Sequence, residues 1–231
     1  DSSMTIKLNG STAGSVALDA PASTTGSADI SFKLPVADGS AGQVLKTDGS
    51  GNLSWVTITS DCVKLASQNV SPADATFALD ILNNSTYHYY KLVWQGVPNV
   101  DNTNLRFRWR TGSADITDTL YSWTNLGVSG NTGTYYDNVG NSDDSGLISY
   151  QAGNQPGEGW NLELTMKPQQ AQPSSGSSVF TSIDRVDGNG NYKAETNILR
   201  LRKDVSPNGF HIFPASGTFA QYQYTLYGFK K

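Results

Sequence analysis

The chain has 231 residues and a formal net charge of −4, and 37% of its residues are hydrophobic and 16% charged. This composition lacks the basic excess of a nucleic-acid-binding protein, and no apolar run reaches the length of a membrane-spanning helix. The only cysteine, Cys62, excludes an internal disulfide. We expect its thiol to be buried and inert, as is usual for a free cysteine.

The first sixty residues differ sharply in composition from the rest. Of these sixty, 32 are Gly, Ser, Thr or Ala, and only Phe32 and Trp55 are aromatic. The other 171 residues hold 22 of the 24 aromatic side chains. We therefore expect two domains, a thin segment over residues 1–60 and an aromatic-rich head over residues 61–231.

Short alternating strands separated by turns are predicted within residues 1–60. The dipeptides Asp38-Gly39 and Asp48-Gly49 are typical turn sequences. One chain of such strands buries too little apolar surface to offset the entropy of ordering, which costs roughly 1–2 kcal/mol per residue for the backbone alone. Because the alternation is too regular for a plain linker, we expect an intertwined trimeric β-shaft, in which three chains wind round one axis and share a core. The expected strands are 4–8, 14–21, 26–35, 43–47 and 53–56.

The head shows a different pattern, in which strand signals recur about every ten residues from Thr76 onward. Tyr90, Leu92 and Trp94 fall on one face of one such strand. No segment has convincing helical periodicity. The pattern predicts an all-β head, an antiparallel β-sandwich of the jelly-roll type, whose last strand reaches almost to Lys231. The expected strands are 87–94, 104–110, 119–123, 147–150, 160–167, 179–184, 192–202, 210–213 and 219–229.

One predicted strand, over residues 104–110, presents three arginines on the face opposite Leu105, Phe107 and Trp109. These are Arg106, Arg108 and Arg110. Three guanidinium groups on one face can bind phosphates or acidic sugars, or can pair with acids on a neighbouring strand or subunit. Because Arg200 and Arg202 repeat the pattern, we favour pairing at a subunit interface over binding of an anionic ligand.

A candidate sugar-binding loop runs from Tyr121 to Asn141, where aromatic side chains and amides lie among glycines. The alternative is that Tyr121 and Trp123 belong to the core. The pair Tyr135-Tyr136 lacks strand alternation and is the better candidate for exposure. The candidate binding residues are Tyr121, Trp123, Tyr135, Tyr136, Asp137 and Asn138.

Catalytic motifs are weak in this sequence. The chain has only two histidines, His88 and His211, and neither a Gly-x-Ser-x-Gly nor a His-Glu-x-x-His motif. Carboxylate pairs typical of glycan hydrolysis are also unconvincing. Asp143-Asp144 suits a solvated loop. In the other candidate pair, Glu158 with Glu163, we expect Glu163 to face away from the core. We therefore expect a protein that is not an enzyme and needs no cofactor.

Metal binding is not expected either. Residues 187–191 imitate the start of a calcium-binding loop, but Tyr192 stands where that loop requires glycine and Ile198 where it requires glutamate. A hairpin turn is the better interpretation of this segment.

The run from Leu34 to Trp55, LPVADGSAGQVLKTDGSGNLSW, resembles a run that recurs before the distal domain of tailed-bacteriophage fibre proteins, especially marine ones. The ending from Gly217 to Lys230 is similar to the close of a jelly-roll tip in such fibres. The resemblance implies a homotrimeric virion fibre, attached to upstream fibre or virion proteins, whose C-terminal head binds a bacterial surface glycan or an outer-membrane receptor. It implies no particular binding residue, because the receptor-contacting loops of the family diverge.

Two alternatives to this adhesin remain open at the level of sequence. The chain could be a capsid head fibre or decoration protein whose head has no essential receptor role. It could also be a depolymerase that cuts surface polysaccharide. Sequence favours adhesion, because groups suited to acid–base chemistry are sparse while aromatic side chains in loops are not.

Overall fold

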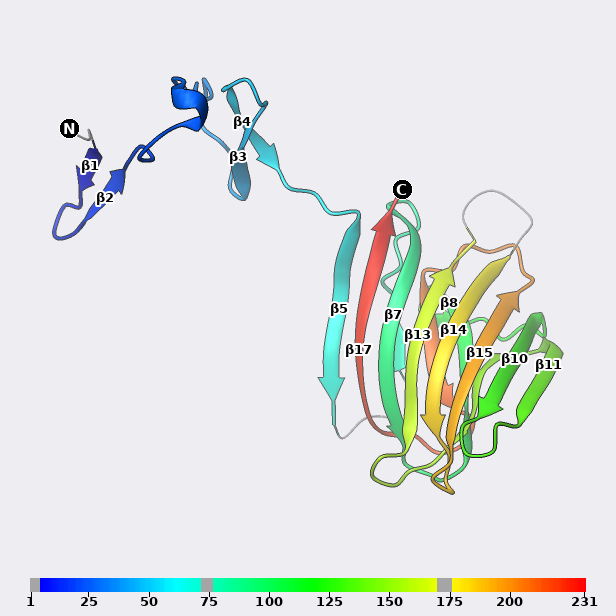
Figure 1. Ribbon diagram of the computed structural model, residues 1–231. Coiled ribbons are helices and arrows are strands. Elements are labelled where there is room, and N and C mark those ends of the chain that lie inside the picture. The colour runs from blue at the N-terminus through cyan, green and yellow to red at the C-terminus, as the bar shows by residue number, and fades with distance from the viewer. Residues whose placement is uncertain (1–4, 72–76, 170–175) are drawn as a thin grey trace. The chain divides into compact units, whose positions relative to one another are not determined.

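The computed structural model describes residues 5–71, 77–169 and 176–231. The chain divides into two compact units, Asp1–Thr59 and Ser60–Lys231 (Figure 1). Both consist of strands and turns, and one short 3-10 turn is the only helical element in these ranges, so the all-β prediction is confirmed. No helix in the described parts is long and apolar enough to cross a membrane.

The first unit contains two antiparallel hairpins. Strand β1 (Ile6–Asn9) pairs with β2 (Ser15–Leu18), and β3 (Gln43–Thr47) pairs with β4 (Leu53–Thr57). In the first hairpin Ile6 lies opposite Leu18, and Leu8 lies opposite Val16. Because side chains alternate between the two faces of a strand, these four apolar residues share one face of the hairpin.

The predicted strand over residues 26–35 is wrong. Gly26 and Ser27 have φ angles of 66° and 57° within the 3-10 turn η1 (Thr25–Ser27). This left-handed backbone cannot continue a strand. Within residues 26–35, an isolated bridge between Lys33 and Asn52 is the only strand-like pairing.

The first unit has no hydrophobic interior of its own. No residue between 5 and 59 is buried. The alternating apolar side chains that define its strands are instead turned to solvent, so their burial contributes nothing to the stability of the isolated chain. The side chains at least 60% exposed include Ile6, Leu8, Val16, Leu18, Ile30, Phe32, Leu34 and Val36.

The second unit contains two antiparallel sheets that pack against each other. The larger sheet has eight strands, in the order β11-β10-β15-β14-β13-β7-β17-β5 (Figure 1). The predicted inclusion of the C-terminus in a sheet is confirmed, because β17 pairs on both sides. The strands are β5 (Cys62–Val70), β7 (Tyr87–Pro98), β10 (Tyr121–Ser129), β11 (Tyr135–Asp143), β13 (Gly159–Lys167), β14 (Ser177–Val186), β15 (Tyr192–Leu201) and β17 (Phe219–Lys230).

The smaller sheet has the order β12-β8-β16-β6, and the short strand β9 pairs with β8. The core lies between the two sheets. Tyr90, Leu92 and Trp94 of β7 are buried, as are Phe107 and Trp109 of β8, so the predicted inward faces of these strands are confirmed. The strands are β6 (Phe77–Leu79), β8 (Thr103–Thr111), β9 (Ala114–Asp115), β12 (Gly146–Ala152) and β16 (Gly209–Pro214).

Eight of the strands pair in a nested order. Strand β5 pairs with β17, β6 with β16, β7 with β13, and β8 with β12. The first strand of this set thus pairs with the last, the second with the last but one, and so on inward. The hairpins β10–β11 and β14–β15 lie outside this set and widen the larger sheet.

Candidate functional site

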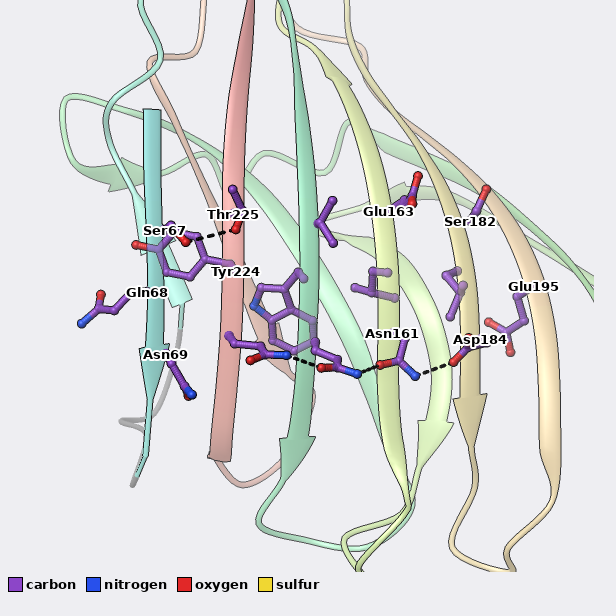
Figure 2. A pocket seen from close by; sticks show the side chains of 16 residues that line it. Ser67, Gln68, Asn69, Asn161, Glu163, Ser182, Asp184, Glu195, Tyr224 and Thr225 are labelled. Atoms are coloured by element: carbon purple, nitrogen blue, oxygen red, sulfur yellow. Dashed lines mark hydrogen bonds between the residues drawn. The ribbon is translucent and has the colours of Figure 1, made fainter. Parts of the chain in front are cut away.

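A row of polar side chains crosses the outer face of the eight-stranded sheet, the face turned away from the core (Figure 2). Gln223, Gln95, Asn161 and Asp184 lie directly opposite one another on β17, β7, β13 and β14. The Gln223 amide donates a hydrogen bond to Gln95, and the Gln95 amide donates one to Asn161. Asn161 Nδ2 donates to Asp184 Oδ1 at 2.5 Å. We call these four residues the amide row.

The carboxylate of Asp184 fixes the direction of the whole amide row. A carboxylate only accepts hydrogen bonds, so Asn161 must point its NH₂ group toward it and its carbonyl toward Gln95. The same reasoning then orients Gln95 and Gln223. Each interior amide uses one N–H and one carbonyl lone pair within the row, and keeps its second N–H and second lone pair for a ligand. The row is therefore preorganised to donate and to accept.

A second row lies beside the first, two residues further along each strand. In this row the hydroxyl groups of Ser67 and Thr225 form a hydrogen bond of 3.1 Å, and Glu163 forms an ion pair with Lys91 at 2.8 Å. The hydrogen bond to Glu163 raises the pKa of Lys91. The outward position predicted for Glu163 is confirmed. Ser182 on β14 faces Glu163 directly and continues this row.

Hollows lie along these rows, and two of them together reach all eight strands. The first has a cavity volume of about 1060 Å³ and covers β5, β17, β7, β13 and β14, while the second, of about 630 Å³, covers β15, β10 and β11. Both rows extend from the first hollow into the second, because the register of β14 with β15 places Thr196 opposite Ser182 and Ala194 opposite Asp184. Leu126, Tyr135 and Asp137 line the second hollow.

We call the two rows and both hollows the outer strip. It crosses all eight strands, which gives it a length of about 33 Å at the usual strand spacing. One end is rich in amides and hydroxyls, and the other end carries Tyr135, which is 84% exposed. Such a surface can hydrogen-bond the hydroxyl groups of an extended polar chain and pack against its apolar edges.

The six predicted binding residues do not form one site. The predicted loop from 121 to 141 is wrong, because most of this segment belongs to the paired strands β10 and β11. Tyr135 and Asp137 lie on the outer face and line the outer strip. The other four side chains belong to the opposite face, because strand residues alternate between faces, although Tyr136 also borders the second hollow. These four are Tyr121, Trp123, Tyr136 and Asn138.

Tyr121 and Trp123 have structural roles, as the alternative interpretation expected. Tyr121 is fully buried, its hydroxyl donates to the carbonyl of Ile116 at 2.9 Å, and burial raises its pKa. Trp123 Nε1 donates to the carboxylate of Asp143 at 2.7 Å. Neither ring is placed to stack on a ligand.

Tyr136 belongs to a buried network centred on Glu195. Glu195 Oε1 accepts from Arg185 Nε at 2.5 Å and from the Tyr136 hydroxyl at 2.7 Å. Its Oε2 accepts from Ser149 at 2.9 Å and from Asn125 at 3.1 Å. Burial and this hydrogen bond raise the pKa of Tyr136. The side chains of Arg185 and Glu195 are only 6% and 0% exposed, so this is a buried ion pair with every carboxylate oxygen satisfied.

The three arginines of β8 pair with acids of their own chain. Arg106 lies 3.8 Å from Asp143 and also donates to Ser145 Oγ at 2.8 Å. Arg108 forms an ion pair with Asp144 at 2.8 Å, and Arg110 forms one with Asp80 at 2.9 Å. The open alternative of pairing with acids on a neighbouring strand is thus observed within one chain, and the favoured pairing at a subunit interface stays a prediction. The acids come from loops and short strands next to β8, which sequence alone did not place there.

Asp115 lies at the centre of this cluster, 2.6 Å from Arg110 and 2.7 Å from Nδ1 of His211. Burial raises the pKa of Asp115, but His211 and then Arg110 lower it more, so that the net pKa lies below the ordinary value of 3.8. A lowered folded-state pKa means that the ionised carboxylate stabilises the fold above its ordinary pKa and that this contribution is lost as the pH falls through the folded pKa.

We predict that Asp115→Asn destabilises the protein at neutral pH and that its difference from the native chain shrinks as the pH falls from about 5 toward 2. Denaturant unfolding at several pH values measures this. Asp137→Asn, which removes one negative charge at an exposed site, is the control and should change the stability at neutral pH by no more than about 0.5 kcal/mol. A difference between Asp115→Asn and the native chain that stays constant with pH would contradict the assignment.

Two further sequence predictions have clear outcomes. The hairpin turn at 187–191 is confirmed, because it connects the paired strands β14 and β15 and Asp187 Oδ1 accepts from the backbone of Asn189 and Asn191 at 3.0 and 2.9 Å. The prediction of a buried Cys62 is wrong, because this free thiol is exposed at the start of the edge strand β5. In the described ranges no group of three His, Cys, Asp or Glu side chains is arranged to hold a metal ion.

Comparison of the chain with protein-family models, with curated proteins and with solved structures found no match. Its function must therefore be inferred from the two units themselves. The relevant features are the first unit without a core, the nested sandwich of the second unit, and the outer strip.

Proposed function

We propose that the chain is the distal part of a homotrimeric tailed-bacteriophage fibre, whose second unit is an adhesive head. The observation that carries the proposal is the absence of any buried residue between 5 and 59, in a unit with regular apolar alternation. Sister chains would supply the interior that this unit lacks, so it would be ordered only as an assembled shaft. The resemblance of residues 34–55 to phage fibre proteins agrees with this role.

We infer that the head is a jelly roll. Its nested pairing, from β5 with β17 inward to β8 with β12, is what results when one long antiparallel hairpin rolls up into two sheets. The hairpins β10–β11 and β14–β15 are insertions into that scheme. Their effect is to extend one sheet to eight strands and so to lengthen the outer strip.

The ligand that best fits the outer strip is a bacterial surface glycan. Oriented amides and hydroxyls suit the many hydroxyl groups of a sugar polymer, and the exposed ring of Tyr135 offers a stacking surface. The carboxylates of Asp184 and Glu163 disfavour a strongly acidic polymer, since like charges repel. Three weak sites at fixed spacing would gain avidity by a factor of roughly 10² or more.

The capsid fibre and the depolymerase remain alternatives that the same experiments separate. A capsid decoration protein would form the trimer but would not be needed for adsorption. A depolymerase would release reducing ends from the polysaccharide, and the carboxylates of Glu163 and Asp184 on adjacent strands would be its first candidates. Adhesion is favoured because both carboxylates are already held by Lys91 and Asn161.

Light scattering of the purified chain tests the assembly directly. A single chain has a mass of 24.8 kDa. The proposal expects three times this mass, and a mass equal to one chain would overturn it.

For the ligand, we predict that Gln95→Ala weakens binding to host cells or to a matching surface polysaccharide by about tenfold per site, since it removes hydrogen bonds and releases the orientation of Gln223. Labelled protein and cell-binding curves provide the measurement. Asn189→Ala, an amide in an exposed turn, is the matched control. If both variants bind like the native chain, the outer strip is not the glycan site.

A further inference from the structure

A second feature of the outer face lies at the opposite end of β5 from the amide row. Cys62, the first residue of β5, is in register with Phe229 of β17, which in turn pairs with Tyr89 of β7. The rings of Tyr89 and Phe229 are stacked, with centroids 4.4 Å apart and planes within 8°. Tyr227 lies two residues before Phe229, on the same face. We call Cys62, Tyr89, Tyr227 and Phe229 the junction face.

These side chains are only partly covered. Cys62 is exposed, and Tyr89, Tyr227 and Phe229 are half-buried. Stacked aromatic rings that retain free surface would gain stability by burying it, and such rings are enriched where proteins meet. The junction face is small, so on its own it covers less area than a stable free-standing interface needs. A partner held nearby by other means is therefore the best fit.

The chain itself provides such a partner, an inference that rests on the proposed trimer. Strand β4 of the first unit ends at Thr57, and β5 of the second begins at Cys62. The five peptide units between Thr57 and Cys62 can span at most about 17 Å when fully extended. If three first units share one axis, each Cys62 must lie within that reach of the end of its own β4. Tethering of this kind gives the three heads millimolar effective concentrations for one another.

We propose that the three heads of one fibre pack against each other through the junction face. The same arrangement leaves the amide row free, because Asn69, beside Gln223, is seven residues and about 23 Å further along β5. Aromatic packing would hold the three heads together at the Cys62 end of β5, and the ligand groups of the amide row, near the other end of β5, would stay open.

The experiment introduces single cysteines into the full chain with Cys62→Ser. Phe229→Cys places a thiol in the junction face, and Gln223→Cys places one on the same strand and face, six residues away. A short bismaleimide and non-reducing gels measure intermolecular cross-linking. We expect Phe229→Cys to cross-link on the order of tenfold faster than Gln223→Cys, since only its thiols meet at high effective concentration. Tyr89→Cys is the second junction variant, used if Phe229→Cys does not fold.

The outcomes separate this inference from the proposed function. Faster cross-linking of the junction variant in a protein of trimeric mass supports both. Equal rates in a protein of trimeric mass overturn the junction contact and leave the fibre intact. A monomeric mass overturns both. Native Cys62 gives an independent check, since the inference expects its modification by a bulky maleimide to be slower in the folded assembly than after denaturation.

Discussion

Replacement of Glu195 by alanine is expected to lower the free energy of unfolding by about 3–5 kcal/mol, which is typical when one partner of a buried ion pair is removed. The reason is the position of Arg185, whose side chain is 6% exposed and whose Nε contacts Glu195 at 2.5 Å. Without the carboxylate, a buried guanidinium charge has no counter-charge. The hydroxyl of Tyr136 also loses its acceptor.

Urea unfolding, followed by tryptophan fluorescence, measures the effect of Glu195→Ala. The matched control is Glu163→Ala, which removes a carboxylate from the exposed pair with Lys91, and exposed pairs of this kind contribute about 0–1 kcal/mol. Glu195→Gln keeps the shape and one acceptor, so it should fall between the two. Through Glu195 the buried network joins β14, β15, β10 and β11 to Ser149 of the smaller sheet. Equal stability of Glu195→Ala and Glu163→Ala would show that this network does not hold the two sheets together there.

The contrast between these two glutamates also shows what sequence can and cannot predict. Alternation along residues 192–202 predicts that Leu199 and Leu201 face the core. The odd-numbered residues Glu195 and Asn197, earlier in the same strand, should then face the core as well. Both are indeed buried. That signal was available, but a charged residue at an inward position gives no hint of its partner. Arg185 lies on another strand, and register alone brings it there.

Strands with a strong apolar face were predictable, and edge strands were not. The strands over 87–94 and 104–110 have large side chains at every second position, and the structure extends both by only a few residues. Strand β11, with the sequence YYDNVGNSD, sits at the edge of the sheet and lacks an apolar face. The same amides and glycines that make it a good edge made it resemble a loop.

The outer strip could not have been predicted from the sequence. Its residues come from all eight strands of one sheet, and Ser67 and Thr225, which share a hydrogen bond, are 158 residues apart. Each polar residue is unremarkable in its own strand, where it marks only the outward face. The strip arises from strand order and register, which local alternation does not encode. Of the predicted binding residues, Tyr135 and Asp137 face it, and Tyr136 borders its second hollow.

The double substitution Leu8→Ser with Leu18→Ser is expected to dissociate the trimer. Both side chains are more than 60% exposed in a single chain and share a face of the β1–β2 hairpin with Ile6 and Val16. If sister chains cover that face, each leucine contributes about 1.5–3 kcal/mol of burial, and a trimer contains six of them. The loss would then be a large part of what holds the first units together, and light scattering should show a mass near that of one chain.

The control for this substitution is Lys7→Ser with Ala17→Ser, which alters a cross-strand pair on the opposite face of the same hairpin. In an isolated chain both double variants change only exposed side chains and should be nearly neutral, within about 0.5 kcal/mol. A difference between them in assembly can therefore arise only from contacts that one chain does not contain. If the leucine variant keeps a trimeric mass at all concentrations, this hairpin face lies outside the shared interior, and the order of the first unit must come from its other apolar residues.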